Sequence, residues 1–415
     1  MSNFSWRRPF ASAYFRSAGS YLGLKLVIFS LAGLASQFLL TRYLVKEDYG
    51  LIIWVATIIG LLSPFGLPGI STSITGAVAK GYDGNFRRGT WYEIIGSTFG
   101  GAVLLGISGY YYFWHNDLLR GGIFAVAGVL GPGLWLDTQQ CYWNGKKNFK
   151  AIFWWSVPVR LVQLVATAIV LQVSPNLVVV FGVQTLIQVV ANLAASFGIM
   201  LSGQANRELS SEYLSFGSYS TVLYFIGTFS VYFDKLVIGS YSGVKALAAF
   251  AVGELLYTYF YKTPSGILTQ IFLPRQAEMP LQDAARWTQQ RQKYLIAGMA
   301  CICMLLAFVV PVVYPLFFTE KYSDSVFYAE LFILCVFLGS PTFLSGTLIR
   351  AHALKKQATV VWLINTLSPL LFVPLFGKLM GVTGIILARG TSNFVLSIYY
   401  FYMINCCKKQ KKVLH

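Results

Sequence analysis

The sequence predicts an all-α integral membrane protein, with about twelve transmembrane helices in two six-helix lobes around a central cavity. Of its 415 residues, 56% are hydrophobic and only 11% are charged, whereas soluble domains carry roughly 25% charged residues. Apolar stretches of about 20 residues recur along the whole chain, and each is long enough as a helix to cross a hydrocarbon core of roughly 30 Å. The short alternating segments that are typical of membrane strands do not occur, so helices account for the spans.

The predicted spans follow one another through short connections. They cover residues 19–40, 48–70, 91–113, 118–138, 152–172, 177–201, 214–241, 246–273, 294–318, 327–349, 357–377 and 381–405. The connection at residues 202–213 divides the chain into an N-terminal six-helix lobe, residues 1–205, and a C-terminal six-helix lobe, residues 206–415. Pro64 and Pro264 lie at similar distances into the second and eighth spans, which is typical of the parallel repeats that build many transporters.

The basic residues indicate the orientation of the spans. Lys and Arg are concentrated in alternate connections, and an even number of spans places both termini on the same side. The positive-inside rule makes that side the cytoplasm. Topology therefore explains the formal net charge of +17, and no nucleic-acid partner is expected.

Signals of enzyme chemistry are missing from the sequence. The three histidines, His115, His352 and His415, have no metal-ligand spacing, and no glycine-rich phosphate loop follows a strand. The six cysteines also lack ligand spacing with histidine. The sequence therefore predicts a transporter with no catalytic residues, no metal ion and no cofactor.

Charged side chains inside the predicted spans point to a functional site. The candidates are five cations and three acids, Lys25, Arg160, Lys235, Lys262 and Arg389 with Asp137, Asp234 and Glu254, while Glu93 lies close to a span end. Each charge near the bilayer centre costs roughly 2.5–3.5 kcal/mol, so other groups must compensate for it. Lys25 lies near the inner end of its span, where snorkelling to the interface is an equally good explanation.

Helical periodicity separates the neighbours Asp234 and Lys235. Because adjacent residues on a helix do not face each other, Lys235 shares a polar stripe with Tyr232, while Asp234 faces another element and a cation from elsewhere in the chain. Further stripes follow the fifth, sixth, eighth and twelfth spans: Ser156, Arg160, Gln163 and Thr167; Gln184, Gln188 and Asn192; Glu254, Thr258, Tyr261, Lys262, Ser265 and Thr269; Arg389, Ser392, Asn393, Ser397 and Tyr400. Such stripes favour helices around a water-filled cavity, with hydrogen bonds between helices as the alternative for the serines and threonines.

The predicted cavity has more cations than acids, which favours an anionic cargo. Phosphate or pyrophosphate fits this charge, and Arg160 and Arg389 are able to grip it by paired hydrogen bonds. A cationic drug would instead require exposed acids. The tryptophans Trp143, Trp154 and Trp155 fit an interfacial belt, with stacking on sugar rings as the alternative.

Four segments resemble a known family. The segment "TRYLVKEDYGL" (41–51) resembles the pattern that follows the family's first span, although the usual glycine near Val45 is missing, and "FDKLVIGSYSGVKALAAFAV" (233–252) resembles the opening of its second half. The segment "FLPRQAEM" (272–279) resembles the end of its eighth span, and "GVTGIILARGTSNF" (381–394) resembles the glycine-rich start of its last. With its span layout, the chain resembles the multidrug/oligosaccharidyl-lipid/polysaccharide (MOP) exporter superfamily, and more closely the Wzx-type flippases of polysaccharide biosynthesis.

This resemblance implies a flippase of the bacterial inner membrane. Its cargo would be an undecaprenyl-pyrophosphate-linked oligosaccharide, the repeat unit of lipopolysaccharide O-antigen or of capsule, moved from the cytoplasmic to the periplasmic leaflet by alternating access. Arg160, Lys235, Lys262 and Arg389, with Lys25 as a weaker fifth, would bind the pyrophosphate and sugars while the tail stays in the membrane lipid. The acids Asp137, Asp234 and Glu254 would balance charge or bind a coupling proton or sodium ion, and a polysaccharide polymerase and chain-length regulator are candidate partners.

Two other function classes stay open at this point. A cation-coupled multidrug antiporter of the same superfamily requires acids to dominate the cavity. A membrane polymerase or acyltransferase requires a long outer loop or a catalytic constellation, and neither is found in the sequence.

Overall fold

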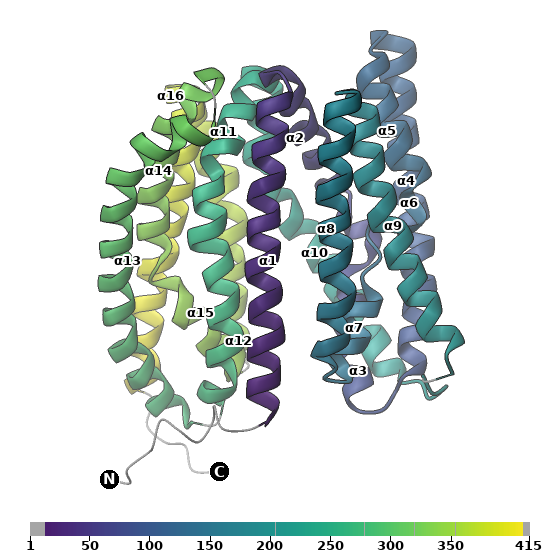
Figure 1. The fold of residues 1–415 in the computed structure, drawn as a ribbon. Coiled ribbons are helices and arrows are strands. Elements are labelled where there is room, and N and C mark those ends of the chain that lie inside the picture. Colours follow the sequence, from purple (N-terminus) through teal and green to yellow (C-terminus); the bar gives the residue numbers. More distant parts are fainter. Residues whose placement is uncertain (1–12, 204, 278, 319, 353, 410–415) are drawn as a thin grey trace. The chain divides into compact units, whose positions relative to one another are not determined.

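The computed structural model describes residues 13–203, 205–277, 279–318, 320–352 and 354–409, and within them every regular element is helical (Figure 1). The predicted all-α class is therefore confirmed. The first half contains α1 (Ala13–Tyr43), α2 (Lys46–Leu61), η2 (Ser63–Gly66), α3 (Pro68–Ala79), α4 (Gly84–His115), α5 (Leu118–Val129), α6 (Gly131–Leu134), α7 (Thr138–Gly145), α8 (Phe149–Val173) and α9 (Leu177–Leu201). The second half contains α10 (Ser211–Val237), η3 (Ile238–Ser242), α11 (Gly243–Tyr257), η4 (Thr258–Lys262), α12 (Thr263–Ala277), α13 (Leu281–Phe317), η5 (Glu320–Tyr322), α14 (Ser323–Gly339), α15 (Thr342–Ala351) and α16 (Lys355–Lys409).

The described helices are long and apolar enough for many membrane crossings. Eight pass this test alone, and up to 10 if each of two bent pairs is one span. Two of the eight runs have 56 and 53 residues, more than twice the roughly 20 residues that one crossing needs. Gly243 and Gly381 break these runs with positive φ angles of 82° and 61°. Each run therefore overlaps two of the predicted spans, and most residues of the predicted spans are helical.

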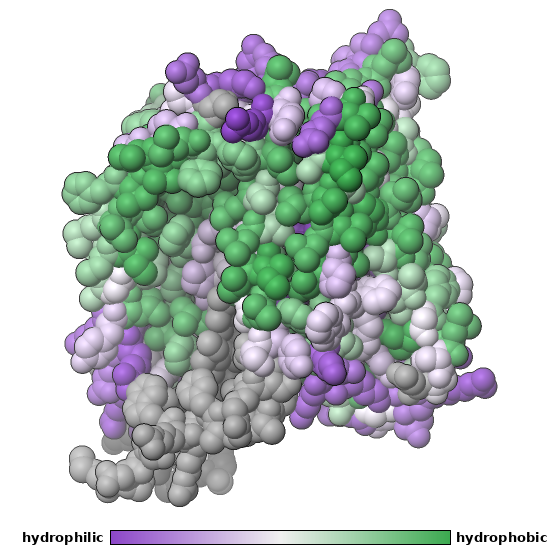
Figure 2. All heavy atoms as spheres, in the orientation of Figure 1, coloured by the Kyte–Doolittle hydropathy of each residue, from purple (hydrophilic) through white to green (hydrophobic). Residues whose placement is uncertain are grey.

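The lateral faces of these helices fit a lipid environment. Phe308 on α13 has 79% of its surface exposed, and Phe113 on α4 and Val173 on α8 are exposed to 84% and 81%. Figure 2 shows hydrophobic side chains over the middle of the helices and hydrophilic side chains near their ends. The chain is a multi-pass membrane protein.

The helices form two compact units. The N-terminal unit comprises the described residues up to Val45 together with Val55–Thr228, and the C-terminal unit comprises Lys46–Trp54 together with the described residues from Phe229 onward. Helices α2 and α10 each contribute residues to both units. The predicted division into lobes of residues 1–205 and 206–415 stays a prediction. It is placed at a connection in the sequence, whereas the two compact units are defined by contacts between residues.

In the N-terminal unit, α1 packs on α8, α3 on α7, α4 on α5 and α8 on α9. Side-chain caps begin three of its helices, because Asp117, Asn148 and Asn176 accept hydrogen bonds from backbone N–H groups of α5, α8 and α9. Glycines allow one close approach: a Cβ on Gly69 of α3 would lie 2.3 Å from the carbonyl oxygen of Gly217 of α10. Ile74 of α3, Phe86 of α4 and Tyr142 of α7 belong to one buried apolar cluster of this unit.

In the C-terminal unit, α11 is the central helix. It packs on α14, which packs on α16, while α12 packs on α15. Residues 247–250 of α11 are almost completely buried. Gly50, near the start of α2, contacts the first turn of α11, since a Cβ there would lie 1.9 Å from the carbonyl oxygen of Val244.

Candidate functional site

Five of the predicted site residues meet in the C-terminal unit. We call them the charge cluster: Asp234, Lys235, Glu254, Lys262 and Arg389, from α10, α11, η4 and α16. Glu254 Oε2 accepts a hydrogen bond from Lys235 Nζ at 2.8 Å, and its Oε1 lies 3.0 Å from Lys262 Nζ and 2.6 Å from Arg389 Nη1. Arg389 Nη2 pairs with Asp234 Oδ2. Three cations face two carboxylates, so the cluster has one positive charge in excess.

Aromatic rings hold Arg389 in this position. Its guanidinium carbon lies 5.2 Å from the ring centroid of Tyr257, 5.7 Å from that of Phe332 and 5.8 Å from that of Phe250. Asn393, one turn further along α16, donates a hydrogen bond to the Tyr257 hydroxyl at 3.1 Å. A guanidinium between aromatic faces and carboxylates satisfies its charge without water.

The adjacent charges Asp234 and Lys235 have different partners, as helical periodicity predicts. Asp234 pairs with Arg389 of α16, and Lys235 pairs with Glu254 of α11. The exposed fraction separates the cations further: 45% of the Lys262 side chain is exposed, against 15% for Lys235 and 16% for Arg389. Lys262 is therefore the cation of this cluster with the most surface to offer a ligand.

The N-terminal unit contains a cavity of about 200 Å³. Its lining comes from α1, α7, α8 and α9: Phe29, Gln139, Gln140, Trp155, Ser156, Val159, Arg160, Gln163, Gln188, Ala191 and Asn192. The predicted polar stripes of the fifth and sixth spans thus meet at one cavity. Its lining contains one guanidinium, five carboxamides and no carboxylate.

Hydrogen bonds among the carboxamides fix the cavity wall. Asn192 Oδ1 accepts from Gln139 Nε2 and from Gln188 Nε2, both at 2.9 Å. Gln163 Nε2 donates to Gln188 Oε1 at 3.1 Å, and Gln163 Oε1 lies 3.5 Å from Arg160 Nη1. A wall of mutually bonded amides presents preorganised donors and acceptors around the guanidinium.

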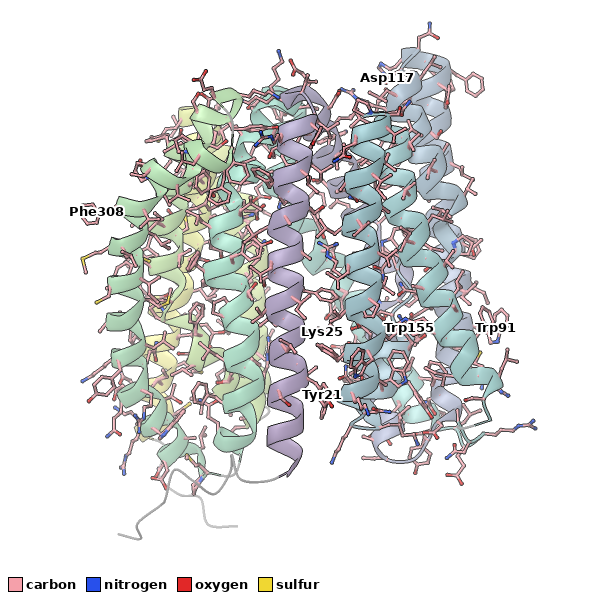
Figure 3. The ribbon with its side chains drawn as sticks, in the orientation of Figure 1. Tyr21, Lys25, Trp91, Asp117, Trp155 and Phe308 are labelled. Atoms are coloured by element: carbon pink, nitrogen blue, oxygen red, sulfur yellow. The ribbon has the colours of Figure 1, made fainter. Side chains whose placement is uncertain are left out.

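Lys25 adds a second cation beside this cavity (Figure 3). Its ammonium donates to Gln140 Oε1 at 3.2 Å and lies 5.2 Å from the ring centroid of Phe29. Both partners line the cavity, so Lys25 approaches it from α1. Trp155 supplies an aromatic wall, and its indole N–H has no hydrogen-bond partner among the described residues.

Asp137, the remaining one of the eight predicted residues, forms no ion pair among the described residues and does not line the cavity. It precedes α7, and its Oδ1 lies 2.6 Å from the hydroxyl of Ser71 on α3. The same hydroxyl contacts the carboxyl group of Glu93 on α4. The sequence identifies Glu93 only as an acid close to a span end and gives Ser71 no role, because their approach depends on how three helices pack and leaves no signal within one helix.

The sequence model of a family described as polysaccharide biosynthesis protein matches residues 39–327. Among curated proteins, none matches the chain significantly. Among solved structures, the chain is similar to a multidrug resistance MATE family transporter of the MOP superfamily. For the inward-facing conformation the TM-score is 0.71 at 14% identity, and the match covers 95% of this chain and 100% of that chain. For the outward-facing conformation the TM-score is 0.64 at 14% identity, and the match covers 95% of this chain and 97% of that chain.

It is also similar to a MOP superfamily transporter from Pyrococcus furiosus, with a TM-score of 0.64, 12% identity and coverage of 96% of each chain. That transporter is described as having a binding pocket of reverse polarity, which suggests a different function. At these identities the likeness shows the fold, and it confirms the predicted MOP exporter-like architecture.

Proposed function

Because the chain belongs to the polysaccharide biosynthesis protein family, we propose that it is a flippase for undecaprenyl-pyrophosphate-linked oligosaccharides. The cargo is a repeat unit of O-antigen or capsule, carried from the cytoplasmic to the periplasmic leaflet of a bacterial inner membrane. Both termini lie in the cytoplasm, in accord with the positive-inside bias of the connections. A polysaccharide polymerase and a chain-length regulator are candidate partners on the periplasmic side.

The observation that carries this proposal is the cationic, carboxylate-free lining of the cavity. Arg160 is able to bind a phosphate by paired hydrogen bonds, and Lys25 adds a second positive charge at the cavity wall. In a site shielded from water, this attraction is several times stronger than in bulk solvent. A cationic drug would find no counter-charge in this lining.

The remaining lining suits sugars. Carboxamides both donate and accept hydrogen bonds, as do sugar hydroxyls, and the rings of Phe29 and Trp155 offer faces on which a sugar ring packs. The unpartnered indole N–H of Trp155 is a further donor for a hydroxyl or phosphate oxygen. Phosphate and sugar recognition thus occur together in one small cavity.

In the charge cluster, the exposed Lys262 supplies a further cation for the cargo. Arg389 and Lys235 are committed to Asp234 and Glu254, so their main role is to hold α10, α11 and α16 together. The reverse polarity described for the Pyrococcus furiosus transporter supports the view that the charge of the binding pocket varies within one fold.

Flipping is tested in proteoliposomes that contain the purified protein and lipid-linked repeat units extracted from the source strain. A membrane-impermeant glycosidase then measures how fast sugars reach the outer leaflet. We expect Arg160→Ala to lower the flipping rate at least tenfold and Arg160→Lys to retain part of it, because lysine keeps the charge but not the paired hydrogen bonds.

Arg42→Ala is the matched control, since Arg42 is an exposed arginine of the same unit and is absent from the cavity lining. It should flip at the wild-type rate. Wild-type rates in Arg160→Ala would contradict the proposal, and so would export of cationic dyes without any flipping of lipid-linked sugar.

A further inference from the structure

Two carboxyl groups of the N-terminal unit share one serine hydroxyl. Ser71 Oγ lies 2.6 Å from Asp137 Oδ1 and within hydrogen-bonding distance of Glu93 Oε1. The three side chains come from different elements, α3, the residue before α7, and α4, so tertiary packing alone brings them together. This group, Glu93, Ser71 and Asp137, is separate from the cavity lining and from the charge cluster.

The number of protons in this group is constrained. A serine hydroxyl has one hydrogen, so it donates to one carboxyl oxygen only. Its second short contact to an oxygen needs a proton from the other carboxyl group. If both carboxylates were ionised, one of the two contacts would place a negative oxygen against a lone pair. One carboxyl group therefore carries a proton.

Burial indicates which group is protonated. Glu93 is completely buried, with 0% of its surface exposed, and its Oε2 has no hydrogen-bond partner among the described residues. An ionised carboxylate in that place would have no solvation on one oxygen, at a high free-energy cost. Asp137, the residue directly before α7, keeps exposed surface, so its carboxylate is the better hydrated of the two.

Neighbouring charges do not offer another way to neutralise Glu93. None of the salt bridges of the described residues involves Glu93 or Asp137. The titratable group that faces the pair from α7 is the thiol of Cys141, and α3 contributes the hydroxyl of Ser71. The short contacts of the Ser71 hydroxyl to both acids are hydrogen bonds, which a bound proton completes.

We propose that Glu93, Ser71 and Asp137 form a proton-binding site, in which Glu93 carries a proton at neutral pH and exchanges it with water through Ser71 and Asp137. In the exchange, Glu93 Oε1–H passes its proton to Ser71 Oγ while the Ser71 hydroxyl passes its own proton to Asp137 Oδ1. Asp137 then releases a proton to water. Glu93 is left as a carboxylate, and Ser71 keeps one hydrogen throughout.

Loss of the proton has a mechanical consequence. It leaves two carboxylates on either side of one hydroxyl, and their repulsion favours separation of α4 from α7. The site thereby couples proton movement to a change in the helix packing of the N-terminal unit. This role in transport rests on the proposed flippase function, whereas the bound proton does not.

Infrared spectroscopy of the purified full-length protein in lipid nanodiscs tests the bound proton without any sugar substrate. Protonated carboxyl groups have a C=O stretching band that ionised ones lack, and exposed acids are ionised at pH 7. We expect a band at neutral pH that shifts in D₂O, is lost in Glu93→Gln and keeps wild-type size in the control Glu212→Gln, an exposed glutamate of the same unit. Glutamine mimics the protonated side chain, so this variant should fold.

Two further variants make the test specific. Ser71→Ala should keep the band but shift its frequency, because the acceptor of the Glu93 proton is gone. Asp137→Asn should keep the band and slow its response to D₂O. The absence of a band at pH 7, or a full-sized band in Glu93→Gln, would overturn the proposal. Loss of the band in Asp137→Asn but not in Glu93→Gln would overturn it as well. So would loss of the wild-type band when sodium chloride replaces choline chloride at constant pH. A flipping assay that fails while the band behaves as expected would count against the flippase function only.

Discussion

At the scale of single residues, Arg389 illustrates how a charge inside a membrane protein is accommodated. Its guanidinium is shared by Asp234 and Glu254 and enclosed by aromatic rings. Helical periodicity predicts that Asp234 meets a distant cation, and this prediction is confirmed. The identity of that cation depends on the packing of α16 against α10 and α11, which no pattern along the chain specifies.

Replacement of Arg389 by alanine should destabilise the protein by roughly 3–5 kcal/mol, because it leaves the buried carboxylate of Asp234 without its cation. Thermal unfolding of the detergent-solubilised protein measures the loss. Adding Asp234→Asn in the same background should restore part of the stability by removing the unpaired charge. Equal stabilities of the single and double variants would show that the pair is not coupled.

Lys262→Ala should behave differently. With 45% of its side chain exposed, Lys262 contributes roughly 1 kcal/mol or less to folding, as exposed ion pairs generally do. Its loss should nevertheless reduce the flipping rate, because it removes the most accessible cation of the charge cluster. Flipping and thermal unfolding, measured on the same preparation, separate the two effects. Reduced stability with unchanged flipping would assign Lys262 a structural role.

At the scale of helices, the sequence predicts where the spans lie better than how they bend. The predicted span at residues 48–70 is bent by 50° where α2 gives way to η2 and α3, and the one at residues 118–138 is bent by 71° between α5 and α6. Hydropathy is continuous across both breaks, so it reports one span in each case. Pro64 and Pro132 mark the bends, because proline removes a backbone donor and disrupts a continuing helix.

The contact between α3 and α10 in the N-terminal unit depends on glycine. Because a Cβ on Gly69 would overlap the backbone of Gly217 and Thr221, we expect Gly69→Ala to destabilise the protein by about 1–3 kcal/mol through forced separation of the helices.

Gly106→Ala is the control for this contact. Nothing lies within 4 Å of a Cβ at Gly106 in α4, so alanine there should be neutral or stabilise the protein by roughly 0.5–1 kcal/mol. Thermal unfolding of both variants gives the comparison. A stability of Gly69→Ala equal to that of Gly106→Ala would mean that the α3 and α10 backbones are not in contact.

At the scale of the whole molecule, the candidate site residues divide between two units. Five of the eight predicted residues form the charge cluster, Lys25 and Arg160 approach the cavity, and Asp137 belongs to the proton-binding site. Composition and helical periodicity are sufficient to identify these residues. A charged side chain inside an apolar span stands out in the sequence, and it needs a compensating group whichever helix it packs against. Their grouping into three sites requires contacts between helices distant in sequence, so it could not be predicted.

If the bound proton drives transport, flipping should respond to a pH gradient across the vesicle membrane. Glu93→Gln has no proton to release, so its flipping should no longer depend on the gradient, whereas Glu212→Gln should respond like the wild type. Initial rates with and without an imposed gradient provide the measurement. A gradient response retained in Glu93→Gln would place the coupling site elsewhere in the chain.

Helix α10 contributes to both compact units. Its first part, through Thr228, carries Gly217 and Thr221 against α3, the helix of Ser71, and its last part carries Asp234, the partner of Arg389. One helix must therefore satisfy two unlike requirements: small residues for a close backbone contact at one end, and a carboxylate for a buried ion pair at the other.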